Sequence, residues 1–164
     1  MTRAHRAVLS LGANIGDAAA TLRSARDHLA ADADIEIMAT STLYTTAPIG
    51  GPEQPDFTNA VMVIATDLSP MGLLSVIHRI EDLHDRQRTQ RWGPRTLDID
   101  IVTFDDEVLD DQDLTVPHPR AYERAFVLIP WLEVDDAAVL PGHGKVIDLV
   151  KLIDDQAMTP AGVW

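Results

Sequence analysis

The order of apolar patterns over residues 8–104 constrains this chain more than any other feature. Short apolar runs, typical of strands, alternate with segments in which apolar residues recur every three or four positions, typical of helices. We therefore predict a strand, a helix, two strands, a helix and a strand, in that order. The predicted strands cover residues 8–11, 35–44, 59–66 and 96–104, and the predicted helices begin after Asp17 and Ser69.

Both predicted helices carry a start signal and an apolar stripe. Asp17 and Ser69 are residue types that cap helix N-termini, and Pro70 stands at the first helical position, where proline is tolerated. The stripes contain Leu22, Ala25 and Leu29 in the first helix and Leu73, Leu74, Ile77 and Ile80 in the second. Each helix can thus bury one face against a sheet.

The order of elements matches the split βαβ arrangement. The predicted fold class is α/β, more narrowly α+β: a ferredoxin-like βαββαβ core with an antiparallel sheet and helices packed on it. The last third is a C-terminal elaboration: an acidic hairpin-like excursion over 105–113, an apolar segment over 126–132 interrupted by Pro130, and a short helix over 146–153. No linker or internal repeat divides the chain, so we expect one domain over residues 1–164.

The charge balance limits the partners. Thirteen lysines and arginines stand against 26 aspartates and glutamates, a formal net charge of −13. A surface that tracks nucleic acid or a membrane needs positive potential, so we expect neither as a partner. The chain has no cysteine, which removes disulfides and thiolate metal sites and fits the cytoplasm. No apolar run approaches the roughly 18 residues of a membrane span.

Positive charge is concentrated as arginine in one short segment. Four arginines lie close together in the sequence: Arg86, Arg88, Arg91 and Arg95. Guanidinium groups bind phosphate or carboxylate through paired hydrogen bonds. The segment suggests a polyanion site, with a solvated charged loop as the alternative.

A pair of carboxylates follows the arginines. In Thr-Leu-Asp-Ile-Asp-Ile-Val, Asp98 and Asp100 would project from one face of a strand, while Leu97, Ile99 and Ile101 enter the opposite face. Adjacent carboxylates repel unless a cation or a proton intervenes, and their oxygens suit Mg²⁺ shared with substrate phosphates. We predict a magnesium site here, against the alternative of a solvated strand face.

Two other segments give weaker signals. Residues 12–17 are rich in glycine but lack the residues of a phosphate-binding P-loop. They are better interpreted as a tight turn in which Gly12 and Gly16 adopt unusual backbone angles and Asp17 caps the helix. A loop over 45–56, rich in proline and glycine, is long enough to be functional.

Four single residues each leave two interpretations open. Glu81 lies beside the apolar stripe of the second helix and could face the same cleft as the arginine segment. His118, in Val-Pro-His-Pro-Arg, could contact a ligand or serve only as a spacer in a stiff loop. Phe57 and Asn59 could stack on a flat heterocycle and bind its edge, or they could be an ordinary core phenylalanine and a turn asparagine.

Taken together, these segments resemble the 6-hydroxymethyl-7,8-dihydropterin pyrophosphokinase family of folate biosynthesis. The resemblance covers residues 8 to about 132 and rests on Leu-Gly-Ala-Asn-Ile-Gly-Asp, residues 44–61, residues 86–101, and Val-Pro-His-Pro-Arg followed by Arg-Ala-Phe-Val-Leu. The stretch Arg-Trp-Gly-Pro-Arg-Thr-Leu-Asp-Ile-Asp-Ile is the most specific, because it joins a basic loop to a two-carboxylate strand at a fixed spacing.

The resemblance implies an enzyme that transfers the β,γ-pyrophosphoryl unit of ATP to the hydroxymethyl oxygen of the pterin and releases AMP. It implies two Mg²⁺ ions held by Asp98 and Asp100, with Arg88 and Arg95 as further catalytic residues. On the ATP side it places Glu81, Arg88, Trp92, Arg95, Thr115, His118 and Arg124. On the pterin side it places Thr46, Ile49, Phe57, Asn59, Trp92 and Phe126.

Three residues depart from the family pattern. They are Ala47, where a proline is common, His78, where a glutamine can contact nucleotide, and Asp85, where the basic loop usually has glycine. We expect a monomer whose partners are ATP and the pterin. Because neither the 45–56 loop nor the 86–95 loop has an apolar stripe, we also expect ATP to bind before the pterin binds well.

Two other functions are compatible with this fold class. A nucleic-acid-binding module would need exposed aromatic residues and a basic face, whereas this chain is acidic and has few aromatic residues. A non-catalytic ligand-sensing domain would not need paired carboxylates beside four arginines.

Overall fold

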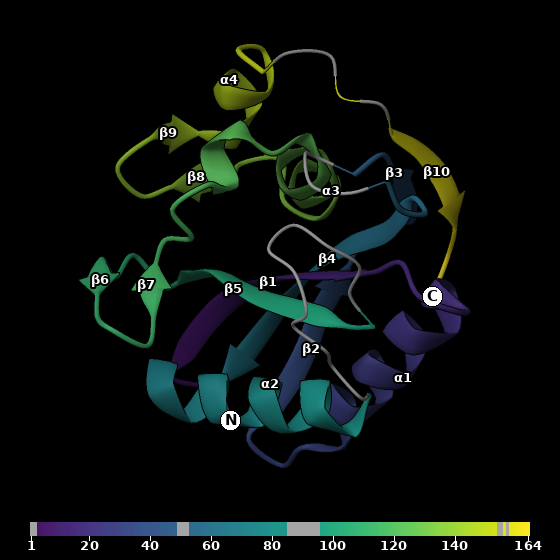
Figure 1. The fold of residues 1–164 in the computed structure, drawn as a ribbon. Helices are drawn as coiled ribbons and strands as arrows, with labels where there is room; N and C mark the ends of the chain where they lie inside the picture. The colour runs from purple at the N-terminus through teal and green to yellow at the C-terminus, as the bar shows by residue number, and fades with distance from the viewer. Residues whose placement is uncertain (1–2, 49–52, 85–95, 154–155, 157) are drawn as a thin grey trace.

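An antiparallel sheet lies at the centre of the computed structural model, which describes residues 3–48, 53–84, 96–153, 156 and 158–164 (Figure 1). Its described strands are β1 (His5–Ala13), β2 (Ile35–Thr40), β3 (Leu43–Thr46), β4 (Phe57–Thr66), β5 (Asp98–Phe104) and β10 (Met158–Gly162). They lie in the order β10-β3-β4-β1-β5, and β2 pairs with β4 as well. Helix α1 (Ala18–Ala31) connects β1 to β2, and α2 (Pro70–Leu83) connects β4 to β5. The antiparallel sheet is confirmed, and so is the predicted order of elements except between the two helices, where the described residues form three strands and not two.

The smaller elements follow β5 in the chain. They are β6 (Leu109–Asp110), β7 (Thr115–Val116), the 3-10 helix η1 (Ala121–Glu123), α3 (Ala125–Val134), β8 (Val139–Leu140), β9 (Gly144–Lys145) and α4 (Val146–Val150). The pairing of β6 with β7 forms the hairpin-like excursion that the acidic segment predicts. Among the described residues, no helix has the length and apolar character needed to cross a membrane.

The prediction of a single strand over 35–44 is wrong, because the chain departs from regular pairing at Ser41. The Ser41 amide donates to the Val61 carbonyl at 2.9 Å, but the Val61 amide donates to Ser41 Oγ, also at 2.9 Å. A hydroxyl thus replaces a backbone acceptor in the ladder. The segment is divided into β2 and β3, which pair with different parts of β4.

Both long helices begin where the sequence predicts. Asp17 Oδ1 accepts a hydrogen bond from the Ala20 amide at 3.1 Å, and Ser69 Oγ accepts one from the Gly72 amide, also at 3.1 Å. Gly16 has the predicted positive φ, +65°. The prediction for Gly12 is wrong, because this residue lies within β1 and is not among the glycines with positive φ.

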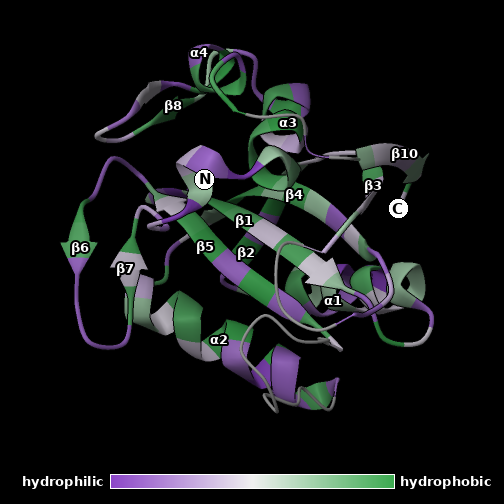
Figure 2. Cartoon of the chain, turned by 45° about the horizontal axis from the view of Figure 1, so that its top comes forward, coloured by the Kyte–Doolittle hydropathy of each residue, from purple (hydrophilic) through white to green (hydrophobic). Residues whose placement is uncertain are grey.

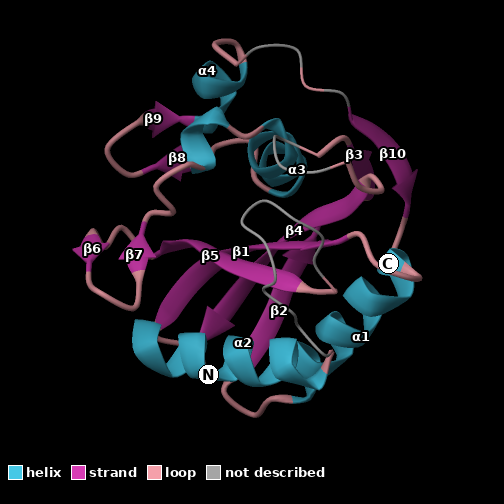
Figure 3. Cartoon of the chain, viewed as in Figure 1, coloured by secondary structure: helices cyan, strands magenta, loops and turns pink. Residues whose placement is uncertain are grey.

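Helices cover both faces of the sheet (Figure 3). Helices α1 and α2 pack on one face, over a core that includes Leu9, Leu11 and Ile101. Helices α3 and α4 pack on the other face, over Val8, Val61 and Val102. Much of the length of the central strands is apolar (Figure 2), because both faces of these strands are covered by helices.

The C-terminal third contributes the second of these layers. The apolar segment over 126–132 is not interrupted, because Pro130 lies inside α3, where burial of the surrounding apolar side chains offsets the loss of one helical hydrogen bond. The predicted helix over 146–153 is shorter and ends at Val150. After it comes β10, which the sequence did not predict and which pairs with β3.

Candidate active site on the α3 face of the sheet

Asp98 and Asp100 lie on the sheet face that α3 covers farther along the strands. Ile99 and Ile101 enter the opposite core beneath α2, together with Leu97, as the alternation predicts. Both aspartates are half-buried. The paired-carboxylate strand is therefore confirmed as a structural feature, with both side chains on one face.

The residues beside these aspartates follow from strand register. On β1, Ser10 pairs with Asp100 and Gly12 pairs with Asp98. On its other side, Gly12 pairs with Asn59 of β4. Because directly opposite residues point to the same face, Asn59, Gly12 and Asp98 form one row across three strands.

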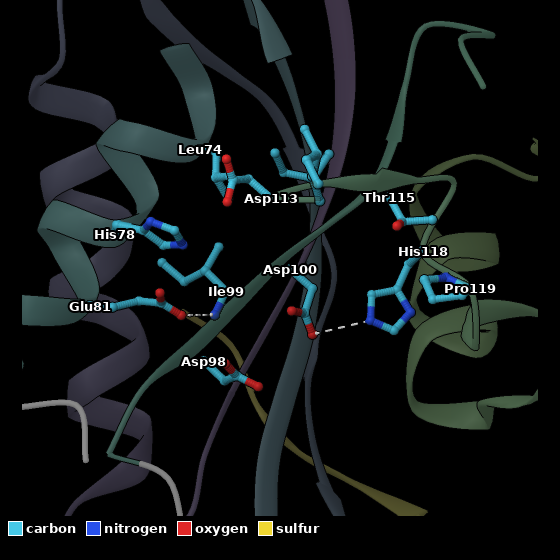
Figure 4. A pocket seen from close by; sticks show the side chains of 12 residues that line it. Leu74, His78, Glu81, Asp98, Ile99, Asp100, Asp113, Thr115, His118 and Pro119 are labelled. Carbon is cyan, nitrogen blue, oxygen red and sulfur yellow. Dashed lines mark hydrogen bonds and ion pairs between the residues drawn. The ribbon is translucent and has the colours of Figure 1, made fainter. Parts of the chain in front are cut away.

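Glu81 of α2 fixes the backbone between the two aspartates. Its side chain is buried, and Oε2 accepts a hydrogen bond from the Ile99 amide at 2.9 Å (Figure 4). In the described sheet β5 is an edge strand, so this amide would otherwise lack an acceptor within the sheet. Glu81 thus lines the pocket beside β5 and anchors the peptide between Asp98 and Asp100; the arginine segment that the sequence placed at the same cleft lies outside the described residues.

His118 approaches the same carboxylates from the opposite side. Its Nε2 lies 3.9 Å from Asp100 Oδ2, and its Nδ1 accepts a hydrogen bond from the Arg120 amide at 3.2 Å. Burial lowers the pKa of His118 to about 4, assisted by the positive charge of Arg124 and opposed by Asp98. At neutral pH the ring is therefore uncharged and carries its proton on Nε2, toward Asp100. The contact with Asp100 is not an ion pair under these conditions.

Arg124 supplies positive charge to this region. Burial lowers the pKa of its guanidinium, while the charges of Asp100 and Asp98 oppose that shift. An arginine remains protonated at physiological pH even after such a shift. Among the described residues, this region therefore brings Asp98 and Asp100 together with the partly buried cation of Arg124 and the neutral imidazole of His118.

A pocket of about 240 Å³ follows the outer edge of β5. We call it the carboxylate pocket. Its lining includes Glu81, Asp98, Asp100, Thr115 and His118, as Figure 4 shows. Among the described residues, no group of three or more acidic or histidine side chains is placed to hold a metal ion by itself. Any ion here would therefore need ligands from water or a bound substrate in addition to the two aspartates.

A second pocket, of about 270 Å³, lies between the end of β3 and the start of α3. We call it the Phe126 pocket. Thr46 and Phe126 line it. Asn59 Nδ2 donates to Thr46 Oγ1 at 2.6 Å, and Phe57 is the cross-strand partner of Thr46. The described residues of the predicted pterin side thus lie close to this pocket.

Gln156 is a residue of this region that the sequence did not indicate. It lines the Phe126 pocket together with Met158. Its Nε2 donates to the Glu123 carbonyl at 2.9 Å, and its Oε1 accepts from the Ala125 amide at 3.0 Å. The amide thereby holds the backbone on both sides of Arg124. No motif surrounds Gln156, so sequence reasoning had no signal for it.

Several predicted site residues lie outside the described part of the chain. They are Ile49, Arg88, Trp92 and Arg95, together with Arg86, Arg91 and the departing residue Asp85. The other two departures are described. His78 lines the carboxylate pocket, and Ala47 lines the Phe126 pocket.

Fold and site together define the class of protein: an α+β protein with a ferredoxin-like core and two pockets, one lined by carboxylates and the other by Phe126. Comparison with known proteins gives the family. The sequence profile described as 7,8-dihydro-6-hydroxymethylpterin-pyrophosphokinase (HPPK) matches residues 8–136, and the chain belongs to this family.

Curated relatives agree over nearly the whole chain. A Haemophilus influenzae protein named 2-amino-4-hydroxy-6-hydroxymethyldihydropteridine pyrophosphokinase is 37% identical over 93% of this chain and 95% of its own length. A Methylorubrum extorquens protein of the same name is 44% identical over 90% of this chain and 93% of its own length.

Solved structures agree on the fold. The crystal structure of wild-type HPPK-DHPS from Plasmodium falciparum with pteroate superposes with a TM-score of 0.72 at 18% identity. The match covers 93% of this chain and 43% of that longer chain. The match is consistent with the ferredoxin-like assignment of the core.

Proposed function

We propose that this chain transfers the β,γ-pyrophosphoryl unit of ATP to the hydroxymethyl oxygen of 6-hydroxymethyl-7,8-dihydropterin. A new bond forms between that oxygen and the β-phosphorus, and the bond from the β-phosphorus to the oxygen bridging the α-phosphate breaks. AMP leaves with the bridging oxygen, and the hydroxymethyl proton is released. Membership of the HPPK family supports this reaction. The structural observation that carries it is the row that joins Asn59, near the Phe126 pocket, to Asp98 in the carboxylate pocket.

Asp98 and Asp100 are the proposed ligands of two Mg²⁺ ions. The donor set fits this metal, because two hard carboxylate oxygens point to one face and leave room for water and phosphate ligands. When bound, Mg²⁺ neutralises charge on the triphosphate and holds its oxygens in position. Glu81 supports both aspartates by fixing the Ile99 amide between them.

The nucleotide side uses the residues around the carboxylate pocket. Arg124 provides positive charge toward the phosphates, and Thr115 and His118 offer hydrogen-bonding groups at the pocket wall. A neutral His118 donates from Nε2, so it can orient a phosphate or ribose oxygen without adding charge. Trp92, Arg88 and Arg95 complete this proposed set. Catalysis by these residues is positioning and charge stabilisation and needs no protein nucleophile.

The pterin side uses the Phe126 pocket. In this proposal the bicyclic ring lies between Phe57 and Phe126, where aromatic faces can stack on it. Asn59 reads the ring edge through its side-chain amide, and the backbone near Thr46 and Ile49 supplies further hydrogen bonds. The bond from Asn59 Nδ2 to Thr46 Oγ1 fixes the amide before the substrate arrives.

Conservative removal of each carboxylate tests the metal assignment. We expect Asp98→Asn and Asp100→Asn each to lower kcat/KM at least about a hundredfold and to raise the Mg²⁺ concentration needed for half-maximal rate, because a charged oxygen ligand is lost. The control is Asp110→Asn, an exposed aspartate in β6, which should behave as wild type. Near-normal turnover and metal dependence in either active-site variant would contradict the assignment.

A further inference from the structure

We infer that Gly12 is a positioning residue for pterin recognition: its missing side chain makes the space in which the Asn59 amide lies. This inference rests on the proposed role of Asn59. The sequence suggested a conformational reason for Gly12, but its φ is not positive, so the backbone alone does not require glycine there. A glycine inside a strand weakens pairing, and a close approach by a neighbouring group is a common reason for its presence.

The neighbouring group here is the Asn59 side chain. A Cβ built on Gly12 would overlap Asn59 Oδ1 and would lie 3.5 Å from Asn59 Cγ. The two residues are directly opposite each other on β1 and β4. Alanine at this position therefore cannot coexist with the amide as it now lies.

Asn59 has little freedom to move away. Its side chain is buried, and Nδ2 is held by Thr46 Oγ1 at 2.6 Å. Thr46 is also buried, so it cannot follow a displaced amide into solvent. A methyl group on residue 12 would rotate or shift the amide and break this hydrogen bond, which removes the fixed edge that reads the pterin.

Gly12 also connects Asn59 to the carboxylate pocket through strand pairing. Its other neighbour is Asp98, the proposed metal ligand. Adjacent strands are about 4.8 Å apart, so the backbones of Asn59 and Asp98 are separated by about 10 Å with only a glycine between them. The hydroxymethyl group and the β-phosphate must meet across this span.

Binding measurements on a double-mutant cycle test the inference. Calorimetry follows 6-hydroxymethyl-7,8-dihydropterin binding to the full chain with Mg²⁺ and a non-hydrolysable ATP analogue, in wild type, Gly12→Ala, Asn59→Ala and the double variant. We expect Gly12→Ala to raise the pterin Kd at least about tenfold in the wild-type background but less than about twofold in the Asn59→Ala background. The Kd of the ATP analogue, measured in the same four proteins, should stay within about twofold.

The other possible outcomes distinguish the role of Gly12 from the proposed pterin site. Equal losses in both backgrounds, or no loss from Gly12→Ala while Asn59→Ala weakens binding, would overturn the role of Gly12 and leave the proposed function intact. Unchanged pterin affinity in Asn59→Ala would overturn the pterin site together with this inference. If Gly12→Ala alone fails to fold, the double variant should still melt close to Asn59→Ala, because the obstructing oxygen is gone. Failure of the double variant to fold would overturn the inference.

Discussion

Glu133 connects α3 to the start of β3 through the hydrogen bonds of its carboxylate. It accepts hydrogen bonds from the Thr42 amide at 2.8 Å, from Thr42 Oγ1 at 2.7 Å and from the Tyr44 hydroxyl at 2.7 Å. Burial raises the pKa of Glu133, but the hydrogen bonds from Thr42 and Tyr44 outweigh it, and the pKa lies below its usual value. Burial, with help from Glu133, raises the pKa of Tyr44 to about 12.

This network predicts a pH-dependent stability. Because the folded pKa of Glu133 is lowered, its contribution is complete above the unfolded value of about 4.3 and is lost as pH falls through the folded value. We expect Glu133→Gln to reduce the free energy of unfolding by about 1 kcal/mol at pH 7. Thermal unfolding from pH 7 to pH 3 should show the two melting temperatures converging. A difference in melting temperature between wild type and Glu133→Gln that stays constant over this pH range would contradict the stabilising role of the ionised Glu133 carboxylate.

Phe57 gives a residue-level test of the pterin side. We expect Phe57→Ala to raise the pterin Kd about tenfold, because stacking on a flat ring is lost, while nucleotide affinity changes little. Calorimetry with each ligand separates the two effects. Equal weakening for pterin and for an ATP analogue would mean that Phe57 supports the whole site and does not stack on the pterin.

At the scale of elements, the C-terminal segment holds the start of α3. Arg124 is the N-cap residue of this helix, and its side chain makes no capping hydrogen bond. The Gln156 side-chain amide instead bonds the backbone on either side of Arg124. We expect Gln156→Ala to lower the free energy of unfolding by about 2 kcal/mol, about 1 kcal/mol for each lost bond. Urea unfolding measures this change. Gln156→Glu keeps the acceptor for the Ala125 amide, so we expect it to lose only about half as much stability as Gln156→Ala. A loss equal to that of Gln156→Ala would contradict the proposed role of these two hydrogen bonds.

The elements that sequence predicts well are those with a local signal. The caps at Asp17 and Ser69 and the alternation around Asp98 depend on neighbours within a few residues, and the structure confirms them. The pairing of Gly12 with Asn59 depends on register between strands more than forty residues apart, which no local pattern encodes. β10 was missed for a related reason, since Met-Thr-Pro-Ala-Gly has no alternating apolar pattern and pairs only because β3 offers an edge.

At the scale of the whole molecule, residues 124–126 relate the two pockets, because Phe126 lines one of them and Arg124 interacts electrostatically with Asp100, which lines the other. Arg124 carries the charge that faces Asp100, and its guanidinium lies 5.4 Å from the Phe126 ring centre. A ligand that displaces one of these side chains would therefore change its contact with the other. This arrangement gives nucleotide and pterin a physical connection within the described residues.

We accordingly expect nucleotide to strengthen pterin binding. An ATP analogue with Mg²⁺ should lower the pterin Kd by a factor equivalent to about 1–3 kcal/mol, and pterin should strengthen analogue binding by the same factor, because coupling is reciprocal. Two calorimetric titrations, each with and without the other ligand, measure both sides. Pterin affinity that is independent of nucleotide would rule out the coupling.

The central claim is that the chain transfers a pyrophosphoryl unit and not a single phosphoryl group. The direct measurement follows purified protein with ATP, Mg²⁺ and 6-hydroxymethyl-7,8-dihydropterin by ³¹P NMR, with Asp98→Asn as the inactive control. The account predicts that AMP and a pterin diphosphate appear in equal amounts, only when all three components are present. Formation of ADP and a pterin monophosphate, or nucleotide breakdown that does not depend on the pterin, would contradict it.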